Sequence, residues 1–413
     1  MYSEVYYFKI IKMIRRDVII IGAGIIGLAA AYKIIERSPH LKILLIEKES
    51  NVSTHQTGHN SGVIHSGIYY KPGSLKAINC LKGYRMLLDF CDKNEIDYEL
   101  CGKIIVATEE KELPALDALF NRGIENGLAD MKKLTSEELK NYEPHVKGIA
   151  GIHVPQTGIV DYKIVSQKLS GILKEKRVDI RLNEEVKAIK ISNGSSELIS
   201  TSDEYRAKAI VSCAGLYSDK IAAMVSGGSE IDFRIIPFRG EYYQLEDKAK
   251  HLIKNLIYPV PDPEFPFLGV HFTKRMDGIV EAGPNAVLAF KKEGYKKTDL
   301  DIKELFSTLG FKGFHKIAKK YWKTGFYEIY RSFSKKEFVS SLQKLVPEIK
   351  ENDLVKGGSG VRAQACRSDG SLIDDFLFQE KENIINVCNA PSPGATSALS
   401  IGETISDKVL KLL

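Results

Sequence analysis

The sequence predicts an α/β protein in which a parallel sheet with helices is joined to a second, mixed antiparallel sheet. The β-branched run Asp17-Val-Ile-Ile-Ile-Gly22 is followed by helical residues 28–37 and by a second apolar run at 42–47. This order is typical of a strand–helix–strand unit, which requires parallel strands. Between residues 233 and 290, alternating aromatic-rich stretches are separated by Pro-Asp-Pro and Asp-Gly turns, which indicates antiparallel strands.

The turn between the first strand and helix carries a dinucleotide-binding motif. Gly22-Ala-Gly24-Ile-Ile-Gly27 fits the pattern in which successive glycines form a tight turn, admit a pyrophosphate and let the helix pack on the strand. The helix N-terminus then offers N–H groups and a positive dipole end to the phosphates. Glu47 ends the next strand and is placed to accept the ribose hydroxyls of an adenosine, which disfavours the 2′-phosphate of NADP.

The loop at 53–67 indicates how a cofactor is wrapped, because it is rich in hydroxyl groups, amides and glycines and too polar for a core. A nicotinamide-linked dehydrogenase would share the glycine turn and Glu47 but would not need this loop. The spacing of His55, His59 and His65 raises metal binding as an alternative. We predict no metal there, because the intervening glycines disfavour a shared helical face and no Cys or Asp joins the histidines.

Composition limits the class of protein. The chain has 413 residues, of which 44% are hydrophobic and 27% charged, as in an ordinary globular protein of two or three domains. The net charge of +6 is too diluted to predict nucleic-acid binding. The positive excess is concentrated in residues 291–336, which contain 13 Lys and Arg against 5 Asp and Glu.

The cysteine pattern, the N-terminal residues and the length of the apolar runs indicate where in the cell the protein is expected. The six cysteines form no C-x-x-C pair, which argues against zinc and against a disulfide framework and favours a reducing compartment. Residues 1–16 lack the apolar core of a secretory signal and the Arg- and Ser-rich character of a mitochondrial presequence. No apolar run reaches the ~18–20 residues that span a bilayer. We therefore expect a cytoplasmic protein, at most peripheral at the inner face of a membrane.

The basic segment at about 298–336 is predicted to be helical, with a break at Gly310–Gly313. Its apolar residues recur at helical spacing, and lysines flank the second half of the stripe. One interpretation is an amphipathic helix with its apolar face on the protein and a solvated basic face. The other is a membrane-surface helix.

Longer motifs resemble a known family. The run from His55 to Ala77 closely resembles the signature of the L-2-hydroxyglutarate dehydrogenase (or oxidase) family, in the FAD-dependent, D-amino-acid-oxidase-like superfamily. The likeness extends to the C-terminus, and small departures occur at Gly394 and at Cys366-Arg367. Further matching motifs are Cys101-Gly-Lys103, Thr157-Gly-Ile-Val-Asp161, Pro237-Phe-Arg-Gly-Glu-Tyr242, Tyr258-Pro-Val-Pro-Asp262, Pro266-Phe-Leu-Gly-Val-His271, Gly283-Pro-Asn-Ala-Val-Leu-Ala-Phe-Lys291, Gly360-Val-Arg-Ala-Gln364 and Asn389-Ala-Pro-Ser-Pro-Gly-Ala-Thr-Ser397.

The resemblance implies FAD as the cofactor, bound by a Rossmann-like domain. It implies that this FAD-binding domain comprises residues 14–80, 147–230 and 352–413, and that a substrate domain comprises 81–146 and 231–351. The helix N-terminus after Gly394 would stabilise negative charge on the reduced flavin. The implied cofactor-binding residues are Gly22, Gly24, Gly27, Glu47, Lys48, Thr57, His59, Asn60, Ser61, Val186, Ala214, Gly215, Gly394, Thr396 and Ser397.

The resemblance also implies oxidation of (S)-2-hydroxyglutarate to 2-oxoglutarate. This chemistry needs a base for the hydroxyl proton, and a neutral imidazole is suited to that role. His271, on an expected strand, is our first candidate and His65 the second; for both, a structural histidine bonded to backbone is the alternative.

Two carboxylates need cations, for which Arg is preferred because its planar fork pairs bidentately. Arg239 and Arg362 are the first candidates, and the weaker ones are Tyr242, Lys291, Asn285 and Gln364. Oxidation of an amino acid or of glycerol-3-phosphate is the alternative activity, and a flavoprotein without catalysis is another. Quinone, an electron-transfer protein or oxygen is left open as the electron acceptor.

Overall fold

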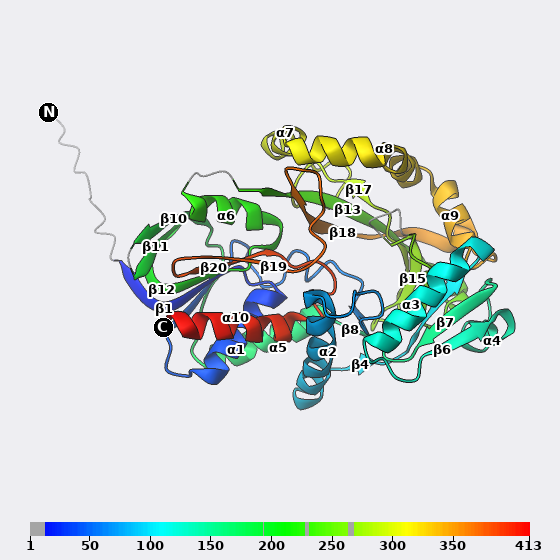
Figure 1. Cartoon of the computed structure of the whole chain (residues 1–413), viewed down its shortest axis with the longest axis horizontal. Coiled ribbons are helices and arrows are strands. Elements are labelled where there is room, and N and C mark those ends of the chain that lie inside the picture. Colours follow the sequence, from blue (N-terminus) through cyan, green and yellow to red (C-terminus); the bar gives the residue numbers. More distant parts are fainter. Residues whose placement is uncertain (1–12, 193, 228–230, 263–267) are drawn as a thin grey trace.

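The computed structural model describes residues 13–192, 194–227, 231–262 and 268–413. Two large sheets lie side by side along the long axis of the molecule, each with helices packed on it (Figure 1). Most of the N-terminal stretch on which the targeting expectation rests, residues 1–12, lies outside the described residues. Pro266 and Phe267 of one family motif also lie outside them.

Within the described residues, the first sheet has eight strands, and it confirms the parallel strand–helix–strand unit. Strand β1 pairs in parallel with β2 and with β12, and β20 pairs in parallel with β12. Strands β10 and β11 add an antiparallel edge. The strands are β1 (Ile14–Ile21), β2 (Ile43–Ile46), β9 (Asp179–Arg181), β10 (Val186–Ser192), β11 (Ser195–Ser200), β12 (Glu204–Ser212), β19 (Leu377–Lys381) and β20 (Ile384–Asn389).

Successive side chains of β1 point to opposite faces of the sheet, and helices pack on both faces. Val18 and Ile20 face a core shared with α1 (Ile25–Arg37), α5 (Tyr162–Glu175) and α10 (Ala398–Leu412). Ile19 and Ile21 face the opposite layer, where α6 (Ser218–Ser226) packs. Because β1 is covered on both faces, it is a continuous apolar run, as is usual for a buried parallel strand.

The second sheet has nine strands in the part of the chain that the structure describes, and it confirms the mixed, mainly antiparallel sheet. Its only parallel pair among the described strands joins β14 to β5, and its longest pair joins β13 to β18. The strands are β5 (Lys103–Ala107), β6 (Lys132–Thr135), β7 (Ala150–Val154), β13 (Phe233–Leu245), β14 (Leu256–Pro259), β15 (His271–Lys274), β16 (Val280–Gly283), β17 (Val287–Leu288) and β18 (Leu354–Arg367). A small third sheet contains β3 (Val63–Ile64), β4 (Tyr98–Glu99) and β8 (Gly158–Val160).

Three elements pair or pack with a different sheet from the one that the expected domain boundaries imply. Strands β7 and β18 lie within the ranges 147–230 and 352–413, yet they are hydrogen-bonded to the second sheet. Helix α2 (Leu75–Lys93) lies mostly in the range 81–146, yet its Leu87 and Phe90 pack in the core of the first sheet. We therefore propose that β7 and β18 belong with the substrate domain and α2 with the cofactor domain.

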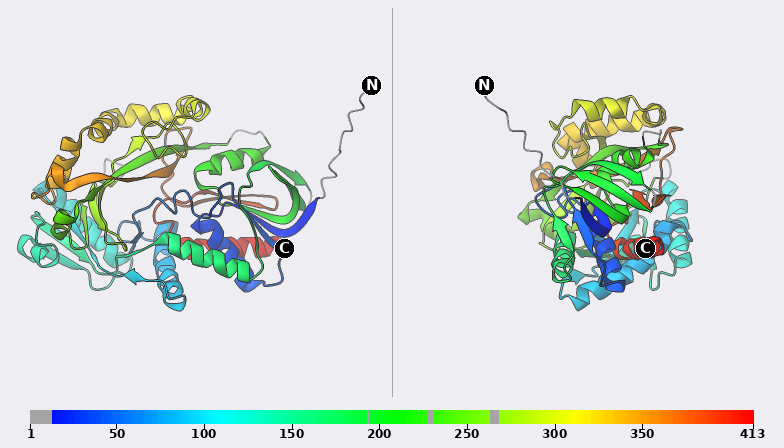
Figure 2. Two further views of the ribbon diagram at one scale, coloured as in Figure 1. Left: turned by 180° about the vertical axis from the view of Figure 1, so that it is seen from behind. Right: turned by 90° about the vertical axis from the view of Figure 1, so that its left-hand side faces the viewer.

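Helices cover the second sheet on its outer side. Helix α7 (Ile302–Leu309) ends and α8 (Lys312–Phe333) begins where the glycine break was expected, and both lie at the rim of the molecule (Figures 1 and 2). Helix α8 ends within the expected helical segment and has non-helical dihedral angles at Tyr321. The remaining helices are α3 (Leu113–Glu125), α4 (Ser136–Tyr142) and α9 (Lys335–Gln343). No described helix combines the length and apolar character that crossing a bilayer requires.

A buried ion pair connects the two halves of the molecule. The Asp219 carboxylate at the start of α6 accepts hydrogen bonds from the Lys292 ammonium at 2.8 and 2.9 Å and from the Ile235 backbone N–H on β13 at 3.0 Å. The Lys292 ammonium also donates to the Leu216 carbonyl. Both side chains are buried, so removal of either would leave an uncompensated charge.

We predict that Asp219→Ala lowers the free energy of unfolding by about 3–5 kcal/mol, because Lys292 would be left without its counter-ion. Denaturant unfolding monitored by circular dichroism measures this. The control is Glu185→Ala, which breaks the exposed pair with Lys187 and should cost about 0–1 kcal/mol. Equal effects of the two substitutions would contradict the structural role given to Asp219.

Candidate functional site

A cavity of about 830 Å³ lies between the two large sheets, within the size range of cofactor and ligand pockets. Loops at the carboxyl ends of β1, β2 and β12 line one part of it, and strands β13 and β18 line another. The residues expected from sequence that line it are Gly22, Gly24, Glu47, Lys48, Thr57, His59, Asn60, Ser61, His65, Val186, Ala214, Gly215, Tyr242, His271, Arg362, Gln364 and Gly394.

The glycine turn has no room for side chains at its two ends. Gly22 has φ of +98°, and a Cβ there would lie 2.6 Å from the Cys213 carbonyl oxygen. A Cβ on Gly27 would lie 2.0 Å from the Gly22 carbonyl oxygen, so α1 packs directly on the backbone that leaves β1. Gly27 therefore shapes the turn from behind the cavity wall. Gly24 is the N-cap of α1 and makes no side-chain cap, which leaves the helix N-terminus facing the cavity.

The Glu47 carboxylate is held at the end of β2 by backbone donors. It accepts hydrogen bonds from the N–H of Ala23 at 2.8 Å and from the N–H of Glu49 at 3.0 Å. These two bonds fix the carboxylate beside the glycine turn while the side chain lines the cavity. The cradle of glycine backbone, helix N-terminus and oriented carboxylate fits a dinucleotide with an adenosine ribose.

The loop at 53–67 is braced by its own side chains. The Thr57 hydroxyl accepts a hydrogen bond from the N–H of Ile25 at 3.1 Å, which ties the loop to the first turn of α1. Asn60 donates to the Thr57 carbonyl at 2.8 Å and accepts from the N–H of Gly62 at 2.9 Å. His59 donates through Nδ1 to the Ser359 carbonyl on β18, at 3.0 Å. The loop therefore bridges the nucleotide cradle and the second sheet.

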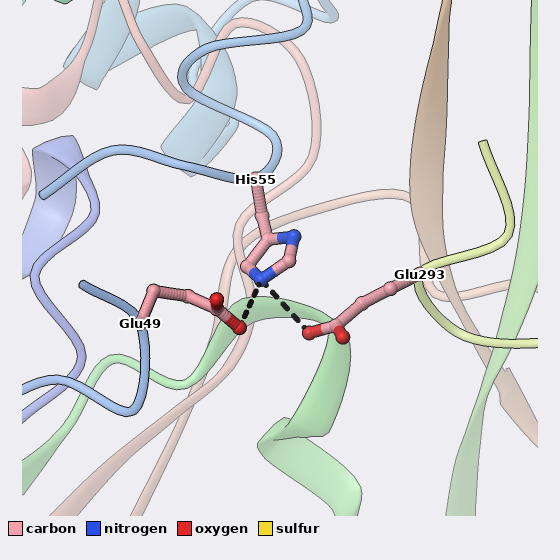
Figure 3. Close-up of side chains that lie close together, drawn as sticks. All are labelled: Glu49, His55 and Glu293. Atoms are coloured by element: carbon pink, nitrogen blue, oxygen red, sulfur yellow. Dashed lines mark hydrogen bonds and ion pairs between the residues drawn. The ribbon is translucent and has the colours of Figure 1, made fainter. Parts of the chain in front are cut away.

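His55 joins a cluster of opposite charges at the same boundary (Figure 3). Its Nε2 lies 3.0 Å from Glu49 and 2.9 Å from Glu293, and the three side chains offer ligand atoms within 4.8 Å of one another. The Lys48 ammonium pairs with Glu49 at 2.5 Å and also with Glu293, so these carboxylates already share a cation. Burial alone would lower the pKa of His55, but its hydrogen bonds with Glu293 and Glu49 outweigh this effect and raise the pKa.

This cluster contains only one of the three histidines that the metal site considered as an alternative would combine. His59 stacks on Tyr295 with ring centroids 4.2 Å apart, and His65 has its Nε2 3.2 Å from the Ser392 hydroxyl. His55 shares Tyr295 with His59, since its Nδ1 lies 3.1 Å from the Tyr295 hydroxyl, whereas His65 has separate partners. The His55 cluster connects the cofactor loop to the segment that follows β17.

One part of the cavity contains two neutral imidazoles. His271 donates from Nδ1 to the Gly269 carbonyl at 2.8 Å, which leaves Nε2 as a hydrogen-bond acceptor. Its ring stacks on Tyr258, with centroids 4.0 Å apart. Burial lowers the pKa of His271 and that of His65 to about 3, so both rings are uncharged near neutral pH.

Strands β13 and β18 bring a cation and polar groups to the same place. Burial raises the pKa of Tyr242 to about 12, and the nearby positive charge of Arg362 opposes this rise. The charge of Arg362 also adds to the lowering of the His271 pKa. Gln364, two residues further along β18, donates to the Ala365 carbonyl at 3.1 Å. Arg362, Tyr242 and His271 therefore lie close together.

Three of the expected substrate ligands lie outside the cavity wall, contrary to the sequence-based expectation. Because side chains alternate along β13, Arg239 points away from the face that carries Tyr242. Its guanidinium pairs with Glu241 at 3.1 Å and donates to the Lys296 carbonyl at 3.1 Å. Asn285 is buried and donates to Glu241 at 3.0 Å, while its Oδ1 accepts from the Glu241 N–H. Lys291 does not line the cavity either.

Two further residues support the cavity from behind. The Thr396 hydroxyl accepts a hydrogen bond from the N–H of His65 at 3.1 Å and lies 2.8 Å from the Tyr162 hydroxyl. Ser397 is fully buried at the start of α10. Neither lines the cavity, whereas Gly394 does.

Two cavity-lining residues near the imidazoles were not predicted from the sequence. Tyr258 lies on β14, and the alternation of aromatic residues in that stretch was a usable signal. Lys76 lines the cavity and pairs with Asp374 at 2.8 Å, almost 300 residues away, which no local pattern reveals.

Comparisons with known proteins agree with this geometry. The model of the family described as FAD dependent oxidoreductase (DAO) matches residues 17–408. A protein named L-2-hydroxyglutarate dehydrogenase from Indibacter alkaliphilus is 54% identical over 96% of this chain and 99% of its own length. The human mitochondrial protein of that name is 44% identical over 95% and 88% of the two chains. The FAD-bound L-α-glycerophosphate oxidase from Mycoplasma pneumoniae has a TM-score of 0.77 at 25% identity, covering 97% and 95% of the two chains.

We predict that Gly27→Ala weakens FAD binding by about tenfold or more, which is ~1.4 kcal/mol, because the added Cβ would force α1 away from the backbone that leaves β1. The flavin-to-protein absorbance ratio after dialysis measures this loss. The matched control is Gly171→Ala on α5, where a Cβ meets nothing within 4 Å and Ala should stabilise the helix by up to about 1 kcal/mol. Retention of flavin by Gly27→Ala at the level of the control would contradict the prediction.

Proposed function

This chain belongs to the FAD-dependent oxidoreductase family and, within it, to the L-2-hydroxyglutarate dehydrogenases, and we propose that it oxidises L-2-hydroxyglutarate to 2-oxoglutarate. The cofactor is FAD, and the substrate class is a small 2-hydroxy acid. The observation that carries the proposal is one continuous cavity in which a dinucleotide cradle meets neutral imidazoles and an arginine.

The reaction removes the proton of the substrate hydroxyl group and a hydride from the carbon that bears that hydroxyl. When bound, FAD supplies the hydride acceptor that no side chain of the protein can provide. The residues of the chain then have to accept the proton, pair with two carboxylates and exclude water.

We propose His271 as the base. The hydrogen bond from its Nδ1 to Gly269 fixes the tautomer, so the lone pair of Nε2 is available in the cavity. Its low pKa keeps the ring neutral before substrate binds, and the negative charge of a bound dicarboxylate would raise that pKa towards the working pH. His65 is the second candidate; its Nε2 is already 3.2 Å from the Ser392 hydroxyl.

For the carboxylates, we propose Arg362 as the principal partner. It lies on β18 opposite Phe238, lines the cavity and is close to Tyr242 and His271. A planar guanidinium can hold one carboxylate with two parallel hydrogen bonds. Tyr242 and Gln364 would add polar contacts from the same wall.

We predict that anaerobic addition of L-2-hydroxyglutarate bleaches the flavin absorbance of the purified protein, while the R enantiomer leaves it oxidised. L-Lactate, glycerol-3-phosphate and an amino acid serve as controls. Bleaching by glycerol-3-phosphate or the amino acid alone would establish the alternative substrate class. A flavin that stays oxidised with every compound would contradict catalysis by this site.

For the electron acceptor, we propose a quinone reached through a membrane-surface face on α7 and α8. Part of the apolar stripe expected on α8 packs on the protein, because Ile317 is buried and Phe314 and Tyr321 pack against the same cluster. In contrast, α7 contributes no buried residue, and other apolar side chains of α8 are exposed. Phe306 is 69% exposed and Phe333 is 77% exposed. The other exposed apolar residues of this face are Ile302, Leu309, Trp322, Phe326, Tyr327, Ile329 and Tyr330.

The charges on the same face support an anionic lipid surface as its partner. Lys319, Lys320 and Lys323 are exposed beside the aromatic residues of α8. Aromatic side chains that enter the headgroup region and lysines that attract anionic lipids are the two features of a peripheral membrane helix. We therefore propose that the enzyme works in the cytoplasm at the inner face of a membrane.

We predict that the protein sediments with vesicles containing anionic lipid at low salt. Replacing Lys319, Lys320 and Lys323 by Gln should weaken this binding by about 100-fold, since each lysine contributes about 1 kcal/mol near such a surface. The matched control replaces Lys168, Lys174 and Lys176 of the α5 region, which are equally exposed, and should change little. Absence of binding by the wild type, or equal loss in both triple variants, would remove the proposed face.

A further inference from the structure

Lys103, at the start of β5, is a buried lysine that the proposed chemistry does not use. Its side chain is 2% exposed, although lysines are almost never fully buried unless they are paired. No carboxylate of the described residues offsets its charge; the one group that favours its charged form is the Cys80 thiol. An ammonium in such a place costs stability and therefore calls for a functional explanation.

Two tyrosines hold this ammonium directly behind the cavity wall. Its Nζ lies 4.3 Å from the ring centroid of Tyr69 and 4.9 Å from that of Tyr258, so both rings make cation–π contacts with it. The same two rings line the cavity. Tyr258 in turn stacks on His271, so one ring separates Lys103 from the proposed base.

The charge of Lys103 acts inside the cavity. After burial, it is the largest of the causes that lower the pKa of His65, and it also contributes to the lowered pKa of His271. A field that disfavours imidazolium at these positions favours a negative charge there.

Most of the cations that line the cavity are already paired with carboxylates of the protein. Arg362 lines the cavity, but Arg239 and Lys291 do not. The ammonium groups of the lining lysines are paired, Lys48 with Glu49 and Glu293, Lys76 with Asp374 and Lys220 with Glu304. A second positive charge near the imidazoles is therefore supplied best by Lys103.

We propose that Lys103 is a positioning cation of the substrate pocket, which stabilises the bound dicarboxylate through the Tyr69–Tyr258 wall. This inference rests on the proposed function, because it takes a dianion as the ligand. Lys103 touches the rings and not the substrate, so its effect is electrostatic and is expected on substrate affinity.

The protonation of Lys103 gives this role a pH signature. Burial lowers its pKa to about 7, so it is charged below that pH and neutral above it. The groups that face it stay neutral from about pH 5 to 9, because burial raises the pKa of the tyrosines and the thiol and lowers that of the imidazoles: Tyr69, Tyr258, Cys80, His65 and His271. Affinity for a dicarboxylate should therefore fall as the pH rises through 7.

The test measures binding of 2-oxoglutarate and of the monocarboxylate 2-oxobutyrate to the FAD-loaded enzyme, by perturbation of the flavin spectrum at pH 6 and pH 9. We expect Lys103→Met to weaken 2-oxoglutarate binding at pH 6 on the order of tenfold, and 2-oxobutyrate about threefold, because a dianion feels the lost charge twice. At pH 9 the variant should resemble the wild type. Lys103→Arg, which stays charged, should retain tight binding at both pH values.

Several outcomes would overturn the inference. Lys103→Met that binds 2-oxoglutarate like the wild type at pH 6, or that loses both ligands equally and keeps the pH dependence, would show a structural role only. Should Lys103→Met not fold, a wild-type affinity for 2-oxoglutarate that does not change between pH 6 and pH 9 would overturn it equally. A wild type that binds no 2-oxoglutarate, in contrast, would overturn the proposed function on which the inference rests.

Discussion

The close contact between α1 and the end of β1 is the constraint on which the rest of the site depends. Because Gly27 rests on the backbone of Gly22, the first turn of α1 is held against the carboxyl edge of the parallel sheet, where its N–H groups face the cavity. The same turn presents the N–H of Ala23 to Glu47, so the carboxylate and the phosphate-binding backbone are fixed relative to each other. The cofactor position is thus determined by backbone geometry more than by side chains.

The second sheet has to be held in register with that turn, since it provides the proposed base. Two charged contacts do this: Lys292 reaches Asp219 on α6, and Glu293 joins Lys48 and His55 in the cofactor loop. Both come from the short segment after β17, so this segment connects the cofactor cradle to the sheet that carries His271 and Arg362. Burial in the shared cavity then keeps the imidazole of His271 neutral.

Local sequence patterns were sufficient to predict the parts of the site whose geometry is set by the backbone. The glycine motif and Glu47 predicted the cradle, and alternation predicted the second sheet that carries His271. The resemblance to a family, rather than any local pattern, indicated the substrate. Sequence patterns did not predict which side chains face the cavity or which partners they pair with. Arg239 and Tyr242 are three residues apart on one strand, yet only Tyr242 faces the cavity. The environment of Lys103 depends on Tyr258, 155 residues further along, so no window of sequence reveals it.

The most direct test of the central claim, that neutral His271 accepts the substrate proton beside the flavin, is the rate of flavin reduction in anaerobic stopped-flow experiments with L-2-hydroxyglutarate. For His271→Gln, which preserves size and hydrogen bonding but is no base, the limiting rate should fall by about 10²–10⁴-fold, with the substrate dissociation constant nearly unchanged. A limiting rate equal to that of the wild type would contradict the claim and assign the proton transfer to another group.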